Sequence, residues 1–175
     1  VMLTKKGPKF FADTAINQDP TAERVAEIAV QAAELVKRMN IEPSIALLSY
    51  SNFGSSDGKT PKKMRDALHI LHENHPDLTV DGEMQANFAV DKDQLKEQFP
   101  FSDLVGSPPN IFIFPGLSSA NIGYKLLQSM AGMEAVGPLL IGLDYPAHVL
   151  QLGADVREIV NTTAMAVVDA QSRET

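Results

Sequence analysis

The sequence predicts a three-layer α/β/α sandwich with a mostly parallel sheet. Short apolar runs alternate with amphipathic stretches of about 12–20 residues along the chain, as in proteins that alternate strands and helices. The short runs are apolar on both faces, which is typical of strands covered by helices on both sides. The composition of the 175 residues, 44% hydrophobic and 21% charged, is that of an ordinary globular domain.

The first strand and helix lie near the N-terminus. Residues 9–15 form a short apolar run and predict a strand. Asp19 and Pro20 predict a helix start, because aspartate accepts hydrogen bonds from the first turn and proline has a helical φ. Apolar residues recur at helical spacing to residue 39, and Asn40 is expected to end the helix.

Two more strands frame a second helix. Residues 44–49 are almost wholly apolar and predict a strand buried on both faces. Pro61 begins the next helix, which ends before Pro76 because a proline disfavours helical backbone at the preceding residue. Residues 78–82 predict the third strand.

The second half of the chain continues the alternation. We expect short helices at residues 83–88 and 94–99, a strand at 110–116 and a further apolar run at 136–143. Ser118 or Ser119 is expected to cap a long helix whose buried face includes Ile122, Leu126, Leu127 and Met130. A last helix is expected over residues 155–170, with Val156, Val160, Thr163 and Val167 in its core stripe.

Charge and cysteine content exclude several classes of function. The net charge is −7, so non-specific binding to nucleic acid or to an anionic membrane is not expected. No stretch approaches the roughly 20 apolar residues of a membrane-spanning helix. The absence of cysteine excludes disulfides, thiolate metal ligands and a cysteine nucleophile, and it agrees with a cytoplasmic location.

Three loops follow predicted strands, where open parallel sheets bind ligands. Residues 51–55 contain glycine and hydroxyls that suit a phosphate or carboxylate, although a plain turn explains them too. Residues 81–85 carry two acids that suit acid–base work or a turn followed by a helix start. Residues 115–121 suit an anion at a helix N-terminus or ordinary capping.

The histidines provide no clear metal site. His69 and His72 could share one helix face as a metal pair, but no third ligand is visible, so a solvated helix end explains them better. His148 has no identifiable partner in the sequence, and no serine nucleophile motif is present. We therefore predict no metal site.

Several segments, in order and spacing, resemble the phosphotransacetylase (phosphate acetyl/butyryltransferase) family. The resemblance implies a fold of two α/β/α lobes, similar to isocitrate and isopropylmalate dehydrogenase lobes, with coenzyme A (CoA) between them and dimers formed through the second lobe. Residues 1–139 would form the second lobe. Residues 140–175 would return into the first lobe, and most of that first lobe would precede Val1. The segments that carry it are FFADTAIN (10–17), DPTAE (19–23), LSYSNFGS (48–55), VDGEMQ (80–85), IFP (113–115), NIGYKL (121–126) and GPLLIGL (137–143).

One segment departs from the active transferases that the chain resembles. Those enzymes carry Ser-Arg-Gly after the last strand and an aspartate five residues later, implicated in binding phosphate and deprotonating CoA. Here the step reads Gln151-Leu152-Gly153, and the aspartate position is Glu158. Glu158 could be a base, but with Asp155 it also fits a capping box, which we favour. The candidate contacts to CoA or phosphate are Ser51, Gly54, Ser55, Asn121, Gln151 and Gly153.

Two segments, Ser51-Asn52-Phe53-Gly54-Ser55 and Val149-Leu150-Gln151, resemble the C-terminal region of bacterial hybrid NADP-dependent malic enzymes more than the active transferases. That resemblance implies a domain without transferase activity that senses acetyl-CoA and forms homodimers or higher oligomers. NADP and Mg or Mn would then bind only to the malic enzyme part of the same chain, outside these residues. The alternatives are an active phosphate acetyltransferase, which converts acetyl-CoA and phosphate to acetyl phosphate and CoA, and a module for assembly alone.

Overall fold

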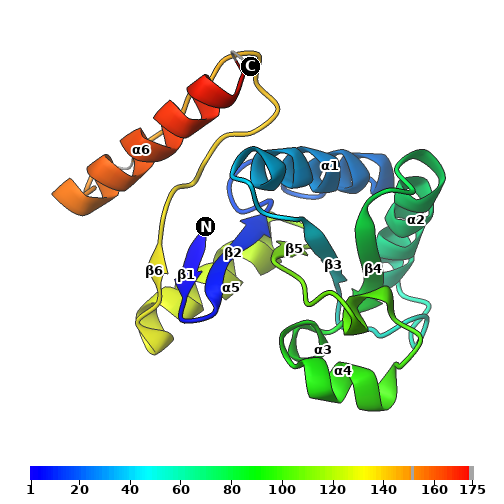
Figure 1. Ribbon diagram of the computed structural model, residues 1–175. Helices are drawn as coiled ribbons and strands as arrows, with labels where there is room; N and C mark the ends of the chain where they lie inside the picture. The colour runs from blue at the N-terminus through cyan, green and yellow to red at the C-terminus, as the bar shows by residue number, and fades with distance from the viewer. Residues whose placement is uncertain (151, 174–175) are drawn as a thin grey trace.

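The computed structural model describes residues 1–150 and 152–173 and has one six-stranded, mostly parallel sheet (Figure 1). The strand order is β4-β3-β5-β2-β1-β6. The four strands from β4 to β2 are parallel, and β1 is antiparallel to both of its neighbours. The strands are β1 (Met2–Thr4), β2 (Gly7–Ala12), β3 (Ser44–Leu48), β4 (Thr79–Met84), β5 (Ile111–Ile113) and β6 (Glu134–Ala135).

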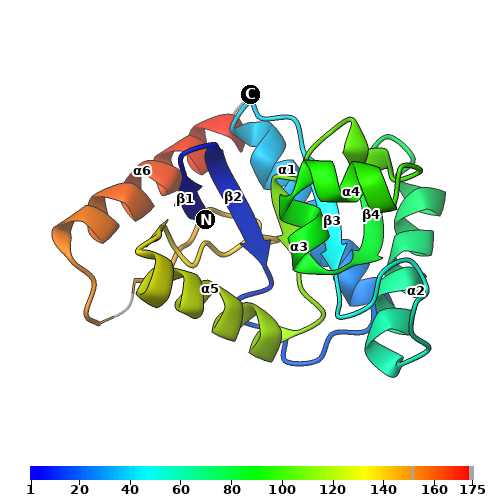
Figure 2. The same ribbon diagram turned by 90° about the horizontal axis from the view of Figure 1, so that it is seen from below.

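Helices cover both faces of this sheet (Figure 2), which confirms the predicted α/β/α sandwich. The helices are α1 (Ala22–Arg38), α2 (Lys59–Asn74), α3 (Ala86–Val90), α4 (Lys92–Gln98), α5 (Leu117–Ala131) and α6 (Val156–Arg173), with a short 3-10 helix η1 (Asp103–Val105).

Strand β3 shows why the sheet needs both layers. All five of its residues are buried, and they alternate between the two faces. Ile45 and Leu47 belong to the hydrophobic cluster under α1 and α2. Ala46 and Leu48 belong to the second cluster, under α3, α4 and η1. The apolar run predicted over residues 44–49 is therefore a strand buried on both faces.

Helix α1 follows its predicted apolar stripe, but its first turn differs from the expected one. Eight of its side chains are buried, including Val25, Ala29 and Val36. Thr21, rather than Asp19, is the N-cap, since the Thr21 side chain accepts a hydrogen bond from the Arg24 N–H. Asp19 forms an ion pair with Lys63 of α2 instead.

Strand β4 extends further than predicted and shortens one expected helix. The sequence from Asp81 to Glu83 looks like a turn, yet it continues the strand to Met84. Gly82 permits this because its φ is +145° and the neighbouring β3 backbone lies close against it. The expected helix over residues 83–88 is therefore only the short α3, which begins at Ala86.

The predicted buried faces of the last two helices are wrong. In α5 the buried residue is Ala120, whereas Ile122, Leu126 and Met130 are more than half exposed. The N-cap is Gly116, not Ser118 or Ser119. In α6 the expected stripe Val156, Val160, Thr163 and Val167 lies on the surface, and Thr162 and Asp169 are buried instead.

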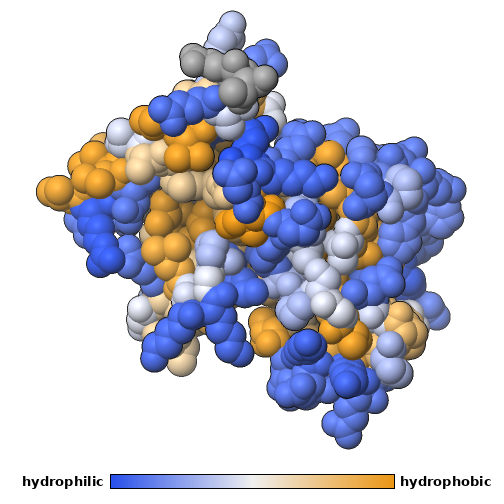
Figure 3. Space-filling model, viewed as in Figure 1, coloured by the Kyte–Doolittle hydropathy of each residue, from blue (hydrophilic) through white to orange (hydrophobic). Residues whose placement is uncertain are grey.

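Helix α6 stands apart from the sandwich, at the upper left of Figure 1, and follows an extended segment after β6. The run expected at residues 136–143 contains no strand. Polar contacts connect α6 to the rest: Arg38 of α1 lies 3.1 Å from Asp169, and Glu134 lies 2.9 Å from Arg157. Figure 3 shows the hydrophobic side chains that gather over α6 as orange atoms at the left.

Candidate functional site

The loops after β2, β3 and β5 leave the same edge of the sheet, because these strands are parallel neighbours. The loop after β5 contacts the loop after β2, since Leu117 N–H donates to the carbonyls of Asn17 and Gln18. The loop after β3 instead contacts β4, where Phe53 N–H donates to the Glu83 carbonyl at 2.7 Å. The predicted loop over residues 115–121 therefore lies with the loop after β2, whereas the predicted loop over residues 51–55 lies against β4.

Asp13 organises the loop after β2. Its carboxylate accepts hydrogen bonds from the backbone N–H groups of Ala15, Ile16 and Asn17, and from the Asn17 side chain. The Asn17 side-chain oxygen in turn accepts a hydrogen bond from Arg24 Nε at 3.3 Å. One aspartate thereby fixes both the loop backbone and the position of a guanidinium group.

These hydrogen bonds control the ionisation of Asp13. Desolvation of the half-buried carboxylate raises its pKa, but the hydrogen bonds from Ala15, Asn17 and Ile16 together outweigh desolvation, so the pKa lies below its ordinary value. Asp13 is therefore charged at neutral pH and acts here as an acceptor for N–H groups.

A cavity of about 350 Å³ opens beside this loop. Such a volume is within the roughly 300–1,000 Å³ range of small-molecule sites. Its wall is formed by residues 10–17 of β2 and the following loop, by α1 and by the 138–143 segment, and Asp13, Asn17, Arg24 and Gln31 are among its polar residues. The Arg24 side chain is 42% exposed and also pairs with Glu27. The cavity can accept an elongated, mainly apolar group with a polar end.

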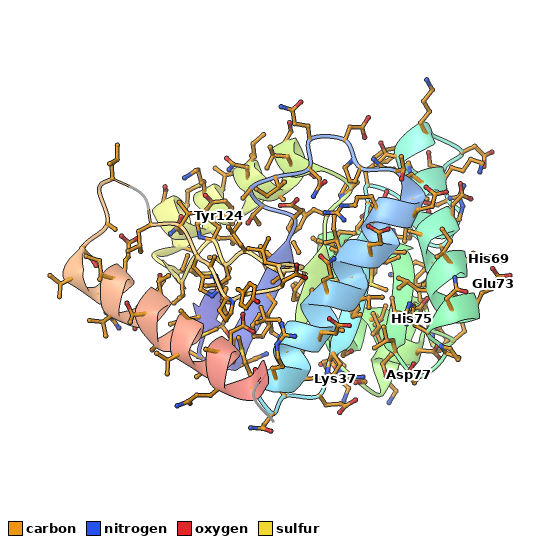
Figure 4. All side chains as sticks on the ribbon, turned by 90° about the horizontal axis from the view of Figure 1, so that it is seen from above. Lys37, His69, Glu73, His75, Asp77 and Tyr124 are labelled. Carbon is orange, nitrogen blue, oxygen red and sulfur yellow. The ribbon has the colours of Figure 1, made fainter. Side chains whose placement is uncertain are left out.

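A second, smaller hollow of about 80 Å³ adjoins the cavity and shares Phe11, Thr14 and Pro138 with it. Tyr124 and Lys125 of α5 line it on one side and Glu158 of α6 on another. Figure 4 shows Tyr124 on α5, across the molecule from His69 and Glu73 of α2.

Two predicted contact residues lie on this side of the molecule. Asn121 of α5 contacts the loop after β2, with its Nδ2 at 3.5 Å from the Thr14 carbonyl. Gly153 is exposed in the turn before α6, with open space where a Cβ would lie. Gln151 lies outside the described residues. Whether Asn121 and Gly153 contact a ligand stays a prediction.

Glu158 forms the capping box that its spacing from Asp155 suggests. The Asp155 side chain accepts a hydrogen bond from Glu158 N–H at 2.8 Å, and the Glu158 carboxylate accepts one from Asp155 N–H at 3.0 Å. The carboxylate thus stabilises the first turn of α6 while it borders the smaller hollow. Leu152, just before this turn, is fully exposed.

The predicted contacts in the loop after β3 are folded inward. Ser51 is completely buried, and its hydroxyl donates to Glu83 Oε1 at 2.7 Å. Gly54 N–H donates to the same oxygen at 3.1 Å, and Ser55 Oγ lies 3.0 Å from Ser51 Oγ. These three residues are together, but they surround a carboxylate of the protein itself.

Four residues, Asp13, Asn17, Arg24 and Glu83, were not identified as site residues from the sequence. Asp13 and Asn17 are four apart after a strand, and that spacing is the signal that could have identified an aspartate-centred turn. The role of Arg24 depends on the same turn. Nothing local indicates the role of Glu83, since its partners are 18 to 32 residues away along the chain.

The histidines of α2 have ordinary partners. His72 Nε2 lies 3.1 Å from the Val80 carbonyl, and His69 lies 3.3 Å from Glu73. Within residues 1–150 and 152–173, no three His, Cys, Asp or Glu side chains are placed to hold a metal ion. In the same part of the chain, no helix combines the length and apolar character needed to cross a lipid bilayer.

One family profile and two curated relatives each match nearly the whole chain. The sequence profile of the phosphate acetyl/butaryl transferase family matches residues 1–167. The NADP-dependent malic enzyme of Haemophilus influenzae is 47% identical over 170 residues, which are 97% of this chain and 22% of that protein. The phosphate acetyltransferase of Clostridium acetobutylicum is 39% identical over 168 residues, which are 95% of this chain and 50% of that protein.

A solved structure supports the same relationship. The phosphotransacetylase of Streptococcus pyogenes superposes with a TM-score of 0.90 at 38% identity, covering 100% of this chain and 53% of that one. The chain thus spans about a fifth of the malic enzymes and about half of these two transferases.

Proposed function

The chain belongs to the phosphate acetyl/butaryl transferase family, and from that premise we propose that it is the acetyl-CoA-sensing, catalytically silent domain of an NADP-dependent malic enzyme. Identity is 47% to such an enzyme over 97% of the chain. In this proposal the parent enzyme decarboxylates malate oxidatively to pyruvate, with NADP and a divalent metal bound outside these residues.

The observation that carries the proposal is Leu152. The active transferases that the sequence resembles have an arginine at this position, and leucine has no guanidinium to hold a phosphate. Loss of such an electrostatic group typically lowers turnover by about 10²–10³. Glu158, at the position of the transferase base, is part of a capping box. Both features favour a domain without transfer chemistry.

We further propose that acetyl-CoA binds where the two hollows meet. The cavity of about 350 Å³ has apolar walls for the methylene and methyl groups of the acyl-pantetheine arm, polar side chains for its amides, and Arg24 to pair with a phosphate. The exposed fraction of Arg24 leaves part of its guanidinium accessible to a ligand. Asn121 and Gly153 would then contact the ligand from the neighbouring segments.

The test uses the intact enzyme that carries this chain. We expect no formation of acetyl-CoA from acetyl phosphate and CoA, saturable acetyl-CoA binding by calorimetry, and a change in malate oxidation on binding. Arg24→Gln should weaken acetyl-CoA binding about tenfold, whereas Lys62→Gln, a control at an exposed pair on α2, should leave it unchanged.

Two outcomes would overturn parts of this proposal. Robust transferase turnover would refute catalytic silence. Absence of both binding heat and thermal shift would refute acetyl-CoA sensing and leave a domain for assembly alone. In the proposal the domain also forms homodimers or larger oligomers, and a monomeric intact enzyme in sedimentation experiments would refute that role.

The second candidate is an active phosphate acetyltransferase. Its support is the 39% identity to the Clostridium acetobutylicum enzyme and the TM-score of 0.90 to the Streptococcus pyogenes structure. Glu158 would then be the base that deprotonates CoA. Turnover that is lost in Glu158→Gln would favour this candidate, whereas turnover unchanged in that variant would exclude Glu158 as the base.

A further inference from the structure

A buried carboxylate lies at the centre of the loop after β3. Glu83 is 0% exposed, and its Oε1 accepts three hydrogen bonds. The donors are the Ser51 hydroxyl at 2.7 Å, the Arg65 guanidinium at 2.9 Å and the Gly54 N–H at 3.1 Å. They come from the loop and from α2, so one oxygen joins the loop, α2 and strand β4.

This set of donors is the chemistry of an anion site. A hydroxyl, a backbone N–H in a glycine-containing loop and a guanidinium all point at one oxygen, as they do around bound carboxylates and phosphates. The Ser55 hydroxyl adds a second layer, because it lies 3.0 Å from the Ser51 hydroxyl and accepts a hydrogen bond from Asn52 N–H. Here the anion is the Glu83 carboxylate of the protein itself.

The other oxygen of this carboxylate has a different environment. Glu83 Oε2 is buried and has no hydrogen-bond partner among the described residues. A buried carboxylate without compensation is costly, so the charge depends on Arg65, which is 30% exposed and also donates to the Ser56 carbonyl. The position of the Glu83 carboxylate and the shape of the loop therefore depend on each other.

We propose that residues 51–55 and Arg65 form an anion-binding site for a small carboxylate, and that Glu83 occupies it as a built-in ligand. An external carboxylate then binds only when the Glu83 side chain is removed. In the native protein Glu83 is a positioning residue that holds the loop. Contact of Ser51 and Gly54 with another anion would require Glu83 to leave. The inference does not depend on the proposed function.

The decisive experiment is chemical rescue in Glu83→Ala, in the intact protein. This change removes the CγH2–COO⁻ group, which is acetate less one hydrogen, so acetate matches the space and charge that are lost. We expect the unfolding midpoint to fall by about 10 °C, from the loss of one partner of a buried ion pair. Added acetate should restore part of that loss in a saturable way, and sodium chloride of equal ionic strength should not.

Two further variants complete the test. Glu73→Ala removes an exposed glutamate of α2 and should show neither the loss nor the rescue. Glu83→Gln keeps an acceptor of nearly the same shape without the charge, and it should have a lower midpoint than wild type without an acetate response. If Glu83→Ala does not fold, the unfolding midpoint of Glu83→Gln still tests whether the loop needs the negative charge.

Four results would overturn the proposal. Glu83→Ala with a wild-type midpoint would show that the carboxylate does not hold the loop. Equal recovery with acetate and chloride would show a general salt effect. A wild-type midpoint in Glu83→Gln would show that a neutral acceptor is sufficient. Saturable rescue by inorganic phosphate but not by acetate would also contradict a site that fits a carboxylate.

Discussion

Replacing Gly82 by alanine should destabilise the protein strongly, because the position has neither the space nor the backbone conformation for a side chain. Gly82 of β4 pairs with Leu47 of β3 and has a φ of +145°. A Cβ added here would lie 2.6 Å from the Leu47 carbonyl oxygen and 3.0 Å from the Leu47 Cβ. Both atoms belong to a fully buried strand that cannot move aside.

The size of the effect follows from two contributions. An alanine with this φ costs about 1–3 kcal/mol of backbone strain. Pushing two buried strands apart costs about another 1–3 kcal/mol. We therefore expect the free energy of unfolding to fall by about 4 kcal/mol, a large share of the roughly 5–15 kcal/mol that stabilises a typical domain.

Two other glycines separate these contributions. Gly106 has ordinary helical backbone and no atom within 4 Å of an added Cβ, so Gly106→Ala should change stability by less than about 1 kcal/mol. Gly54 has a φ of +87° and open space, so Gly54→Ala should show the strain alone, about 1–3 kcal/mol. Urea unfolding followed by far-ultraviolet circular dichroism measures all three. Equal losses in Gly82→Ala and Gly54→Ala would refute the steric argument.

Two further predictions concern charged groups. The pKa of Asp13 is lower in the folded than in the unfolded chain, so its stabilising contribution is complete above the unfolded value of about 3.9 and is lost as pH falls through the folded value. Asp13→Asn should therefore lose less stability than wild type when the pH is lowered below about 4 in acid titrations. The same loss of stability in both proteins would contradict this. Asp169→Asn should lower the free energy of unfolding by about 2 kcal/mol and speed hydrogen exchange in α6, because it breaks the pair with Arg38 at a side chain that is 3% exposed. Lys62→Gln, at an exposed pair, is the control. Exchange in α6 of Asp169→Asn as slow as in wild type would contradict the role of this pair.

The fold could be predicted where local pattern and tertiary environment agree. Residues 44–48 are apolar on both faces and lie between two helical layers, so the short apolar run alone identified the strand. The same reasoning failed in α5 and α6, because periodicity shows an apolar stripe and not what covers it. Leu126 and Val160 are apolar at helical spacing and yet are mostly exposed.

The site was less predictable for a different physical reason. Glu158 and Asp155 are three residues apart, so their capping box is a local pattern that the sequence shows. The contact of Ser51 with Glu83 joins residues 32 apart and exists only once β3 and β4 are paired. Gly82 is a misleading local signal, because a glycine after an aspartate usually marks a turn, and here it allows close strand contact.

The position of β4 at the end of the sheet bears on aggregation. An outermost strand exposes unpaired backbone groups to which a strand of another molecule can add. Here Asp81 accepts hydrogen bonds from the Ser102 hydroxyl at 2.6 Å and from Asp103 N–H at 3.1 Å, which hold η1 against that strand. Asp81→Ala would remove this contact and loosen η1 beside the outermost strand, so we expect the variant to aggregate more readily than wild type.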